Sequence, residues 1–360
     1  MGLAVVAFFS VPALWKSLTR HEIEQPAAVQ MNQVGTALEA LSSNGHILYR
    51  IPVSSGQAIV AEEAKTRTEK TQVGDINADG SEEVVTGAYF TSGGIERRNV
   101  LRAFDSVGNK IFESPLGSPV TFRGAEYLGY YTIASVCLAR SSKSPVDEIW
   151  TVVRHYRSPS FIVRLDCKGK VLGEYWHFGQ VFGPIAVSLA GEDHEMIAFC
   201  GTNDVRDAAD SSYPVLGILD PSKLVGRSQF SESDGFGFPR SGAELYYVRA
   251  ENPYLSMPRD SSRGKGSFTY MRVTEDSSIF VQYASPTISG LPRFDYTFDK
   301  SMQLRSVSID DDSRQILQQE NLRNRSPLAL DAFKSRLKAG VRYWDGKGWS
   351  RQVAKVHVQP

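Results

Sequence analysis

The stretch Val100–Phe112, VLRAFDSVGNKIF, carries the pattern that decides the fold. Alternating apolar residues lead to Asp105, and a second β-rich run begins after Gly108. Because Asp can accept hydrogen bonds from its own turn and Gly tolerates a positive φ, the stretch predicts a β-hairpin. Similar stretches occur at Phe161–Tyr175, at Val215–Gly226, at Phe294–Val307 and, in a weaker form, at Ala37–Val53. The turn residues of the five stretches are Ser42, Asp105, Asp166, Asp220 and Asp299.

A second type of hairpin alternates with the first. Each starts with an acidic residue followed by an apolar run, at Glu83, Glu148, Glu195 and Asp276. Two hairpins per repeat give a four-stranded antiparallel sheet, and repetition of such sheets is typical of a β-propeller. We therefore predict an all-β fold, a β-propeller of about five blades with a range of five to seven. A β-sandwich or two smaller β domains are the alternatives.

The C-terminus and two irregular segments complete this prediction. The turn signal Asp345-Gly346 predicts a C-terminal hairpin, which we expect to share a blade with the N-terminal strands and to close the ring. An insertion rich in Gly, Ser, Pro and aromatic residues is expected at about 228–267. A helical flap is expected at about 310–340, where Phe333 and Leu337 share one helix face.

The N-terminal segment has the composition of a membrane or export element. Met1–Trp15 is apolar and uncharged, and basic residues follow it. A helix of this length spans about 22 Å, less than the ~30 Å of a bilayer core, and the segment lacks the basic start of a signal peptide. A short or truncated anchor, an atypical signal peptide and a buried element are the three interpretations. We assign 1–26 to this segment and 27–360 to the propeller, which places the protein at the cell envelope without fixing its orientation.

Composition excludes some classes of partner and cofactor. Lys+Arg and Asp+Glu both number 40, so the formal net charge is zero, and no nucleic-acid partner is expected. The three cysteines, Cys137, Cys167 and Cys200, are too few for a disulfide framework and are expected to be small buried hydrophobic residues. They leave the redox compartment open.

One segment predicts metal chemistry, residues 74–86, GDINADGSEEVVT. Its possible oxygen ligands are Asp75, Asn77, Asp79, Ser81 and Glu83. Calcium takes about six to eight oxygen ligands, and alternate positions of a curled loop can supply several of them. Gly80 permits the sharp turn. An EF-hand would need an acidic residue where Thr86 stands, so this loop does not fit that motif.

The loop resembles the calcium loop of FG-GAP propellers, the integrin-α-like (VCBS-like) repeat family, with its pattern D-x-[DN]-x-D-G-x-x-[DE] before a buried strand. The resemblance implies that Asp75, Asn77, Asp79, Ser81 and Glu83 bind Ca²⁺ between two strands of one blade, in a structural role. It covers this loop closely and the remaining repeat pattern more loosely. The segments before Glu148 and Glu195 lack the alternating carboxylates, and the FG and GAP signatures are not intact. The chain therefore resembles a degenerate member of the family.

Two further groups of residues are weaker candidates. The predicted insertion contains aromatic and basic residues of the kind enriched at interfaces. They are Phe236, Phe238, Arg240, Tyr246, Tyr247, Arg249, Tyr254, Met257 and Arg259. A loop that packs on its own blade is the favoured interpretation of this group. His155 and His177 are expected to be ordinary histidines of loops or of the aromatic core.

These observations favour a binding or interaction module with a protein or glycan ligand and a membrane-associated N-terminus. A propeller enzyme acting on carbohydrate, a polysaccharide lyase or glycoside hydrolase, is the first alternative. It would require Asp147, Glu148 and His155 to converge in one pocket. A purely structural scaffold domain is the second alternative. No catalytic residue is assigned, because the sequence contains no nucleophile elbow, phosphate loop or zinc-protease motif.

Overall fold

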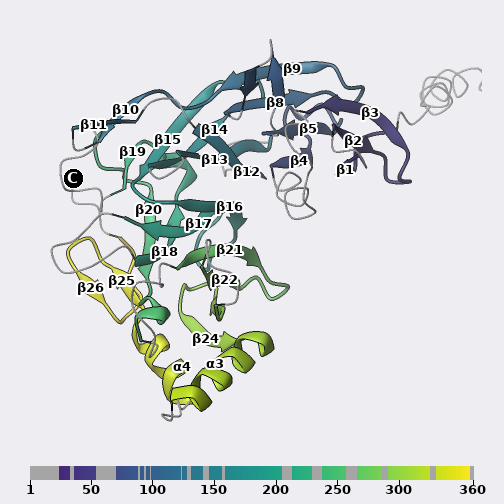
Figure 1. The fold of residues 1–360 in the computed structure, drawn as a ribbon. Coiled ribbons are helices and arrows are strands. Elements are labelled where there is room, and N and C mark those ends of the chain that lie inside the picture. Colours follow the sequence, from purple (N-terminus) through teal and green to yellow (C-terminus); the bar gives the residue numbers. More distant parts are fainter. Residues whose placement is uncertain are drawn as a thin grey trace, which may run out of the picture.

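The computed structural model of this protein describes residues 24–32, 36–53, 70–87, 90–92, 95–97, 99–122, 124–127, 131–140, 146–155, 159–204, 213–228, 237–256, 266–285, 291–324 and 330–356. The apolar segment predicted at 1–26 lies outside these residues as far as residue 23. Within the described residues the chain is mostly β, with several sheets and two α-helices near the C-terminal end (Figure 1). This confirms the predicted all-β class.

The first two sheets are formed by the N-terminal third of the chain. The first sheet contains, in spatial order, β1 (Ala28–Met31), β2 (Ala37–Leu41) and β3 (Ile47–Pro52). The second sheet contains β4 (Thr71–Gly74), β5 (Glu83–Thr86), β8 (Val100–Phe104) and β9 (Lys110–Pro115). Two short hairpins accompany them, β6 (Phe90–Ser92) with β7 (Ile95–Arg97) and β10 (Val120–Phe122) with β11 (Ala125–Tyr127).

Three more sheets follow, and each begins as an antiparallel meander. The third sheet contains β12 (Tyr131–Ala139), β13 (Glu148–His155), β14 (Ser160–Leu165), β15 (Val171–His177) and β19 (Gly226–Arg227). The fourth contains β16 (Val181–Val187), β17 (Met196–Asn203), β18 (Tyr213–Leu219), β20 (Glu244–Arg249), β25 (Arg342–Trp344) and β26 (Trp349–Ser350). The fifth contains β21 (Ser267–Val273), β22 (Ile279–Ala284), β23 (Phe294–Phe298) and β24 (Leu304–Ile309). The helical elements are η1 (Pro221–Lys223), η3 (Pro253–Ser256), α3 (Asp311–Asn324) and α4 (Leu330–Ala339).

Successive sheets pack through their first strands. β1 contacts β4, β4 contacts β12, β12 contacts β16, and β16 contacts β21. Figure 1 shows the resulting open arc, with the first sheet at one end and the fifth sheet and the helices at the other. Buried apolar clusters fill the spaces between neighbouring sheets, as Trp150, Tyr175 and Phe199 do between the third and fourth. The described residues form no closed ring.

The predicted Asp turns are confirmed at Asp105, Asp166 and Asp299, which connect the last two strands of the second, third and fifth meanders. In each, the Asp Oδ1 accepts the backbone N–H groups two and four residues later, at 2.7–3.1 Å. Ser42 forms the equivalent turn between β2 and β3. The third residue after Asp166 is Gly169, with φ of 76°. A Cβ there would lie 2.5 Å from the Phe112 ring, so this turn packs directly on the outer strand of the preceding sheet.

The hairpin predicted at Asp220 is wrong. Asp220 instead caps η1, because its Oδ1 accepts the Ser222 N–H at 2.9 Å and Pro221 occupies the first helical position. The chain then runs into β19, which pairs in parallel with β15 of the third sheet. The expected Gly at the third position is replaced here by Lys223, and the chain crosses between sheets rather than reversing.

The predicted closure of the ring by the two chain ends is also wrong. The C-terminal hairpin β25–β26 forms as expected, but β25 pairs with β20, in the register Val248↔Tyr343. It therefore extends the fourth sheet, where Tyr343 is buried at 3% exposure against the core shared with the fifth sheet. Burial of this ring is the physical reason that the hairpin docks there.

Of the two irregular segments, the helical flap forms as predicted, whereas the insertion at about 228–267 forms only in part. The helical flap is confirmed, since Phe333 and Leu337 of α4 are buried against the core of the fourth and fifth sheets. The insertion predicted at about 228–267 is not wholly an insertion, because it supplies β20, an interior strand of the fourth sheet. All three cysteines are free thiols; Cys200 is buried as predicted, whereas Cys137 and Cys167 are only partly buried.

Candidate calcium loop and buried polar groups

The predicted metal loop connects β4 to β5, the first two strands of the second sheet. Its backbone is curled by its own side chains. Asp75 Oδ2 accepts the Gly80 N–H at 3.0 Å, and Asn77 Oδ1 accepts the Asp79 N–H at 2.8 Å. Asp79 Oδ1 accepts the Ser81 N–H at 2.8 Å. These side-chain-to-backbone bonds hold the loop in a tight curl.

Glu83 ends the loop and is the first residue of β5. Its carboxylate is 1% exposed, and its Oε2 accepts the Ile76 N–H at 3.0 Å. The Asn77 Nδ2 lies between two carboxylates, 3.0 Å from Asp79 Oδ2 and 3.3 Å from Glu83 Oε1. The structure thus brings together the side chains of Asn77, Asp79 and Glu83, while Asp75 bonds the backbone N–H groups of Asn77 and Gly80. Ser81 bonds Asp79 through both its backbone N–H and its side chain.

The loop concentrates negative charge in a partly buried place. Burial, together with the nearby carboxylates of Asp79 and Asp75 and against the lowering effect of the Ile76 N–H, raises the pKa of Glu83 to about 7. The Ser81 N–H instead lowers the pKa of Asp79. A buried carboxylate beside other carboxylates is unfavourable unless a cation or donors compensate it.

The donor chemistry of this loop fits Ca²⁺. Three carboxylates and one amide oxygen are hard oxygen donors on one curled segment. Among the described residues no three His, Cys, Asp or Glu side chains are already arranged as a metal centre. Here the Asn77 amide nitrogen bridges Asp79 and Glu83, and Asn77 must turn its Oδ1 inward to act as a ligand. Asp75, Asn77, Asp79 and Glu83 would hold the ion, which would neutralise this charge.

A contact that the sequence did not predict joins this loop to the segment before β1. Gln25 Nε2 donates to the Gly80 carbonyl at 3.2 Å, and Gln25 Oε1 accepts the Glu82 N–H at 3.0 Å. The first and second sheets therefore meet at the loop as well as through β1 and β4. Gln25 lies more than fifty residues from the loop in the sequence, so no local pattern predicts the contact between them.

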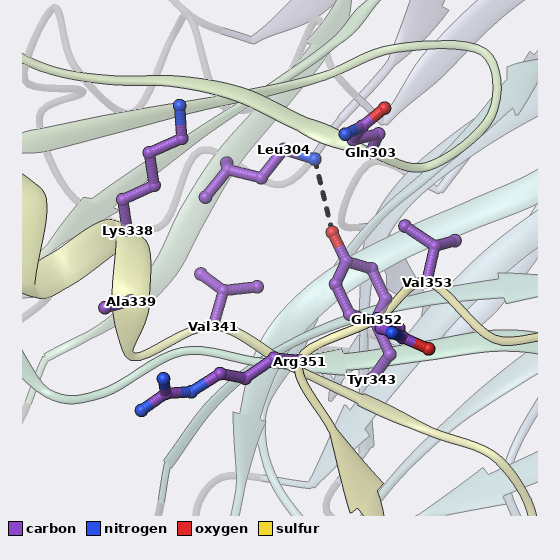
Figure 2. Close-up of a pocket in the computed structure, with 9 residues that line it drawn as sticks. All are labelled: Gln303, Leu304, Lys338, Ala339, Val341, Tyr343, Arg351, Gln352 and Val353. Atoms are coloured by element: carbon purple, nitrogen blue, oxygen red, sulfur yellow. Dashed lines mark hydrogen bonds between the residues drawn. The ribbon is translucent and has the colours of Figure 1, made fainter.

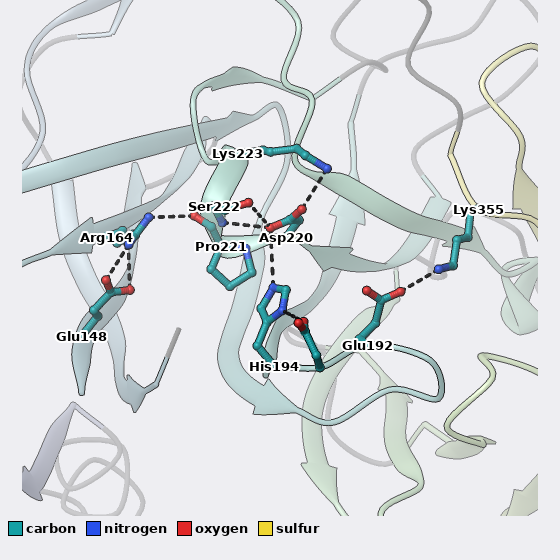
Figure 3. A network of polar contacts seen from close by, with 10 residues as sticks. Glu148, Arg164, Glu192, His194, Asp220, Pro221, Ser222, Lys223 and Lys355 are labelled. Carbon is teal, nitrogen blue, oxygen red and sulfur yellow. Dashed lines mark hydrogen bonds and ion pairs between the residues drawn. The ribbon is translucent and has the colours of Figure 1, made fainter. Parts of the chain in front are cut away.

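The carboxylates and histidine considered for an enzyme do not converge. Glu148 and His155 occupy opposite ends of β13, about 23 Å apart at the usual rise per strand residue. Arg164 clamps Glu148, with Nε–Oε2 at 2.8 Å and Nη2–Oε1 at 2.5 Å, and it also donates to the Pro221 carbonyl at 2.9 Å (Figure 3). Asp147 pairs with Arg140 at 3.3 Å. The bond from Arg164 to Pro221 connects the third sheet to the segment that follows β18 of the fourth sheet.

A further polar network lies beside this clamp (Figure 3). His194 Nδ1 lies 2.6 Å from Asp193 Oδ1, and its Nε2 lies 3.8 Å from Asp220 Oδ1. Lys223 Nζ pairs with Asp220 Oδ2 at 2.9 Å. The network connects the β16–β17 loop to the end of β18, which is a structural role.

The aromatic residues of the predicted insertion do not form a ligand face where they are described. Tyr246 and Tyr254 are buried in the core of the fourth and fifth sheets, and Tyr247 is buried in the core of the third and fourth sheets. Phe238 stacks on Trp176 at 5.2 Å. Phe236, Met257 and Arg259 lie outside the described residues. Packing within the fold, the favoured interpretation, is confirmed for the three tyrosines.

Comparison with known proteins gives little guidance at this point. No protein-family model and no curated protein matches the sequence. Among solved structures, the chain is similar to a protein of unknown function from Bacteroides caccae, with 7% identity and a TM-score of 0.30. That match covers 80% of this chain and 95% of the other. In the described part of the chain, no helix has both the length and the apolar character needed to cross a membrane.

His177 is a fully buried histidine that the sequence placed in a loop or the aromatic core. Its Nε2 lies 2.9 Å from the Tyr247 hydroxyl, which also accepts from Asn203 Nδ2 at 2.9 Å. The Tyr175 hydroxyl donates to the Glu244 carboxylate nearby. Desolvation lowers the pKa of His177 to about 3, so its ring is neutral in the folded protein.

We expect His177 to make the fold sensitive to mild acid. Its pKa is lower folded than unfolded, so its contribution is present above about pH 6.5 and is lost as the pH falls toward 3. Between pH 6.5 and pH 5 the loss is about 2 kcal/mol. Urea unfolding of wild type and His177→Gln at several pH values measures it. His46→Gln, at an exposed histidine, should keep the wild-type slope. Equal slopes for all three proteins would contradict the assignment.

Proposed function

We propose that this protein is a calcium-stabilised β-propeller, or an open relative of one, that acts as a binding module for a protein or glycan at the cell envelope. The observation that carries the calcium part is the contact of Asn77 with Asp79 and Glu83 on the β4–β5 loop, whose turn Asp75 holds through the Gly80 N–H. The propeller part is supported by the repeated meanders and by the contacts between their first strands. The apolar sequence of Met1–Trp15 supports the envelope location.

The proposed role of Ca²⁺ is structural. The loop lies where the segment before β1 meets the second sheet, through the bonds of Gln25. An ion that neutralises the loop carboxylates would hold both sheets in place. The binding role is favoured over catalysis because the candidate acid and base, Glu148 and His155, lie at opposite ends of one strand.

Isothermal titration calorimetry with CaCl₂ tests the proposal directly. Wild-type protein freed of metal by chelator is expected to bind one Ca²⁺ at this loop, and Asp79→Ala is expected to lose that binding. Asp105→Ala is the matched control, because Asp105 also accepts turn N–H groups but lies outside the loop. Absence of wild-type binding, or equal binding by Asp79→Ala, would refute the calcium site.

A further inference from the structure

A cavity of about 460 Å³ lies between α4, the β23–β24 turn and the C-terminal segment (Figure 2). The residues that line it are Gln303, Leu304, Lys338, Ala339, Val341, Tyr343, Arg351, Gln352 and Val353. Its floor is apolar, since Leu304, Val341 and Tyr343 are 9%, 4% and 3% exposed. The Tyr343 hydroxyl accepts the Leu304 N–H at 3.2 Å, which fixes the floor.

The rim of this cavity is positively charged. Lys338 and Arg351 are exposed, and Figure 2 shows Val341 between them. The nine lining residues, all in the described part of the chain, include no carboxylate. The Lys338 Nζ donates to the Arg305 carbonyl at 3.1 Å, and an ammonium group has three donors. In a chain of zero net charge, this local excess suits an anionic ligand.

Positive charge also lies on the opposite face of the adjoining sheet, because Arg342 precedes Tyr343 in β25 and successive strand residues point to opposite faces. Arg249 of β20 stands directly opposite Arg342 of β25, and the register Tyr343↔Ser350 places Arg351 opposite Arg342 in turn. Like charges opposite each other in a sheet are unfavourable. Burial lowers the pKa of Arg342, and the neighbouring Arg351 and Arg249 lower it further, while Glu251 opposes them.

Arg249, Arg342 and Arg351 form a row across neighbouring strands, and aromatic rings contact Arg249 at one end of it. The Arg249 guanidinium lies 4.5 Å from the centre of the Trp349 ring and 5.6 Å from that of Tyr213. Trp349 also contacts Trp344 edge to face at 5.4 Å. Arg, Trp and Tyr are the residue types that dominate binding energy at protein interfaces. Because these rings already restrain the Arg249 side chain, less conformational entropy is lost when a ligand binds to it.

The β25–β26 hairpin also forms the edge of the fourth sheet, where these two faces meet. β26 is the last strand of the fourth sheet, and no described strand pairs with its outer edge. An extended peptide can add to such an edge, with its side chains entering neighbouring pockets. An apolar pocket beside a strand edge favours a peptide over a polysaccharide, whose surface is largely polar.

We infer that the β25–β26 hairpin edge, with the cavity on one face of the sheet and Arg249 and Arg342 on the other, docks an extended acidic peptide segment of a partner protein. One apolar side chain of the peptide enters the cavity, and its carboxylates contact Arg351 and Lys338 at the cavity rim. The inference rests on the proposed binding function and names its partner class. It does not depend on the calcium loop, which belongs to the second sheet.

Selection from a displayed library of random dodecapeptides on immobilised wild-type protein tests the inference. Peptides that combine Asp or Glu with a large apolar residue are expected to be enriched. By fluorescence anisotropy at low salt, an enriched peptide should bind Lys338→Glu/Arg351→Glu about tenfold more weakly or worse. Lys168→Glu/Lys170→Glu has the same change in charge on an exposed turn of the third sheet and should bind as wild type does.

Several outcomes would overturn the inference. They are an absence of enriched acidic peptides, equal binding by the two double variants, and tighter binding of a sulfated polysaccharide than of any selected peptide. Equal melting temperatures of the two double variants exclude misfolding as the cause of weaker binding. Calcium calorimetry on the same sample separates the proposals, since peptide selection can fail while calcium binding succeeds, and the reverse.

Discussion

Arg164→Met is expected to lower the free energy of unfolding by about 3–5 kcal/mol, because it leaves the Glu148 carboxylate buried without its partner. The Glu148 side chain is 7% exposed, and both of its oxygens accept from Arg164. Arg164 also donates to the Pro221 carbonyl, which holds η1, the short helix after β18, against the third sheet. Urea unfolding midpoints measure the loss.

The Arg164 experiment has a matched control and a rescue. Arg140→Met removes an arginine from the exposed pair with Asp147, where the arginine side chain is 63% exposed, and should cost less than about 1 kcal/mol. The double variant Glu148→Leu/Arg164→Met removes both charges and should recover most of the loss, because apolar replacement of a buried pair is often neutral. A loss no larger than that of Arg140→Met would show that the clamp does not support the fold.

Calcium is expected to raise the stability of wild type by about 2.7 kcal/mol at a hundredfold excess over its dissociation constant. The physical reason is that the ion binds the curled loop of the folded state and neutralises Asp75, Asp79 and Glu83 there. Thermal melts with CaCl₂ and with excess chelator measure the effect. The melting temperature should rise with each increase in free Ca²⁺.

Asp79→Ala should melt at the same temperature with calcium and with chelator. The Asp105→Ala turn variant should keep the full calcium response, although its own stability falls through loss of the turn bonds. If chelator leaves wild type unchanged, the loop is a polar hairpin whose Asn77 amide bridges Asp79 and Glu83 without metal.

Local signals identified the turns and the loop because the interactions that form them span only a few residues. The Asp166 carboxylate bonds to N–H groups two and four residues later, so its turn is encoded within five positions. The Asp75–Glu83 loop is similar, since its side chains bond to backbone groups two to seven residues away. The Asp220 turn failed because Pro221 favoured a short helix over a reversal.

The Arg164–Glu148 clamp was open to prediction but was missed. The register Trp150↔Arg164 places Arg164 diagonally across from Glu148 on the same face of the β13–β14 hairpin. Opposite charges at such positions indicate an ion pair. The enzyme alternative instead groups Glu148 with His155, which lies at the far end of the same strand.

By itself, the sequence determined the all-β class, the hairpins at Ser42, Asp105, Asp166 and Asp299, and the loop that could bind calcium. Only the tertiary structure decided which hairpins share a sheet. The docking of β25 on β20 joins residues almost a hundred positions apart, and the row of Arg249, Arg342 and Arg351 exists only because of it. Such pairings depend on which apolar faces remain to be buried once the other sheets have packed, and no local pattern records that.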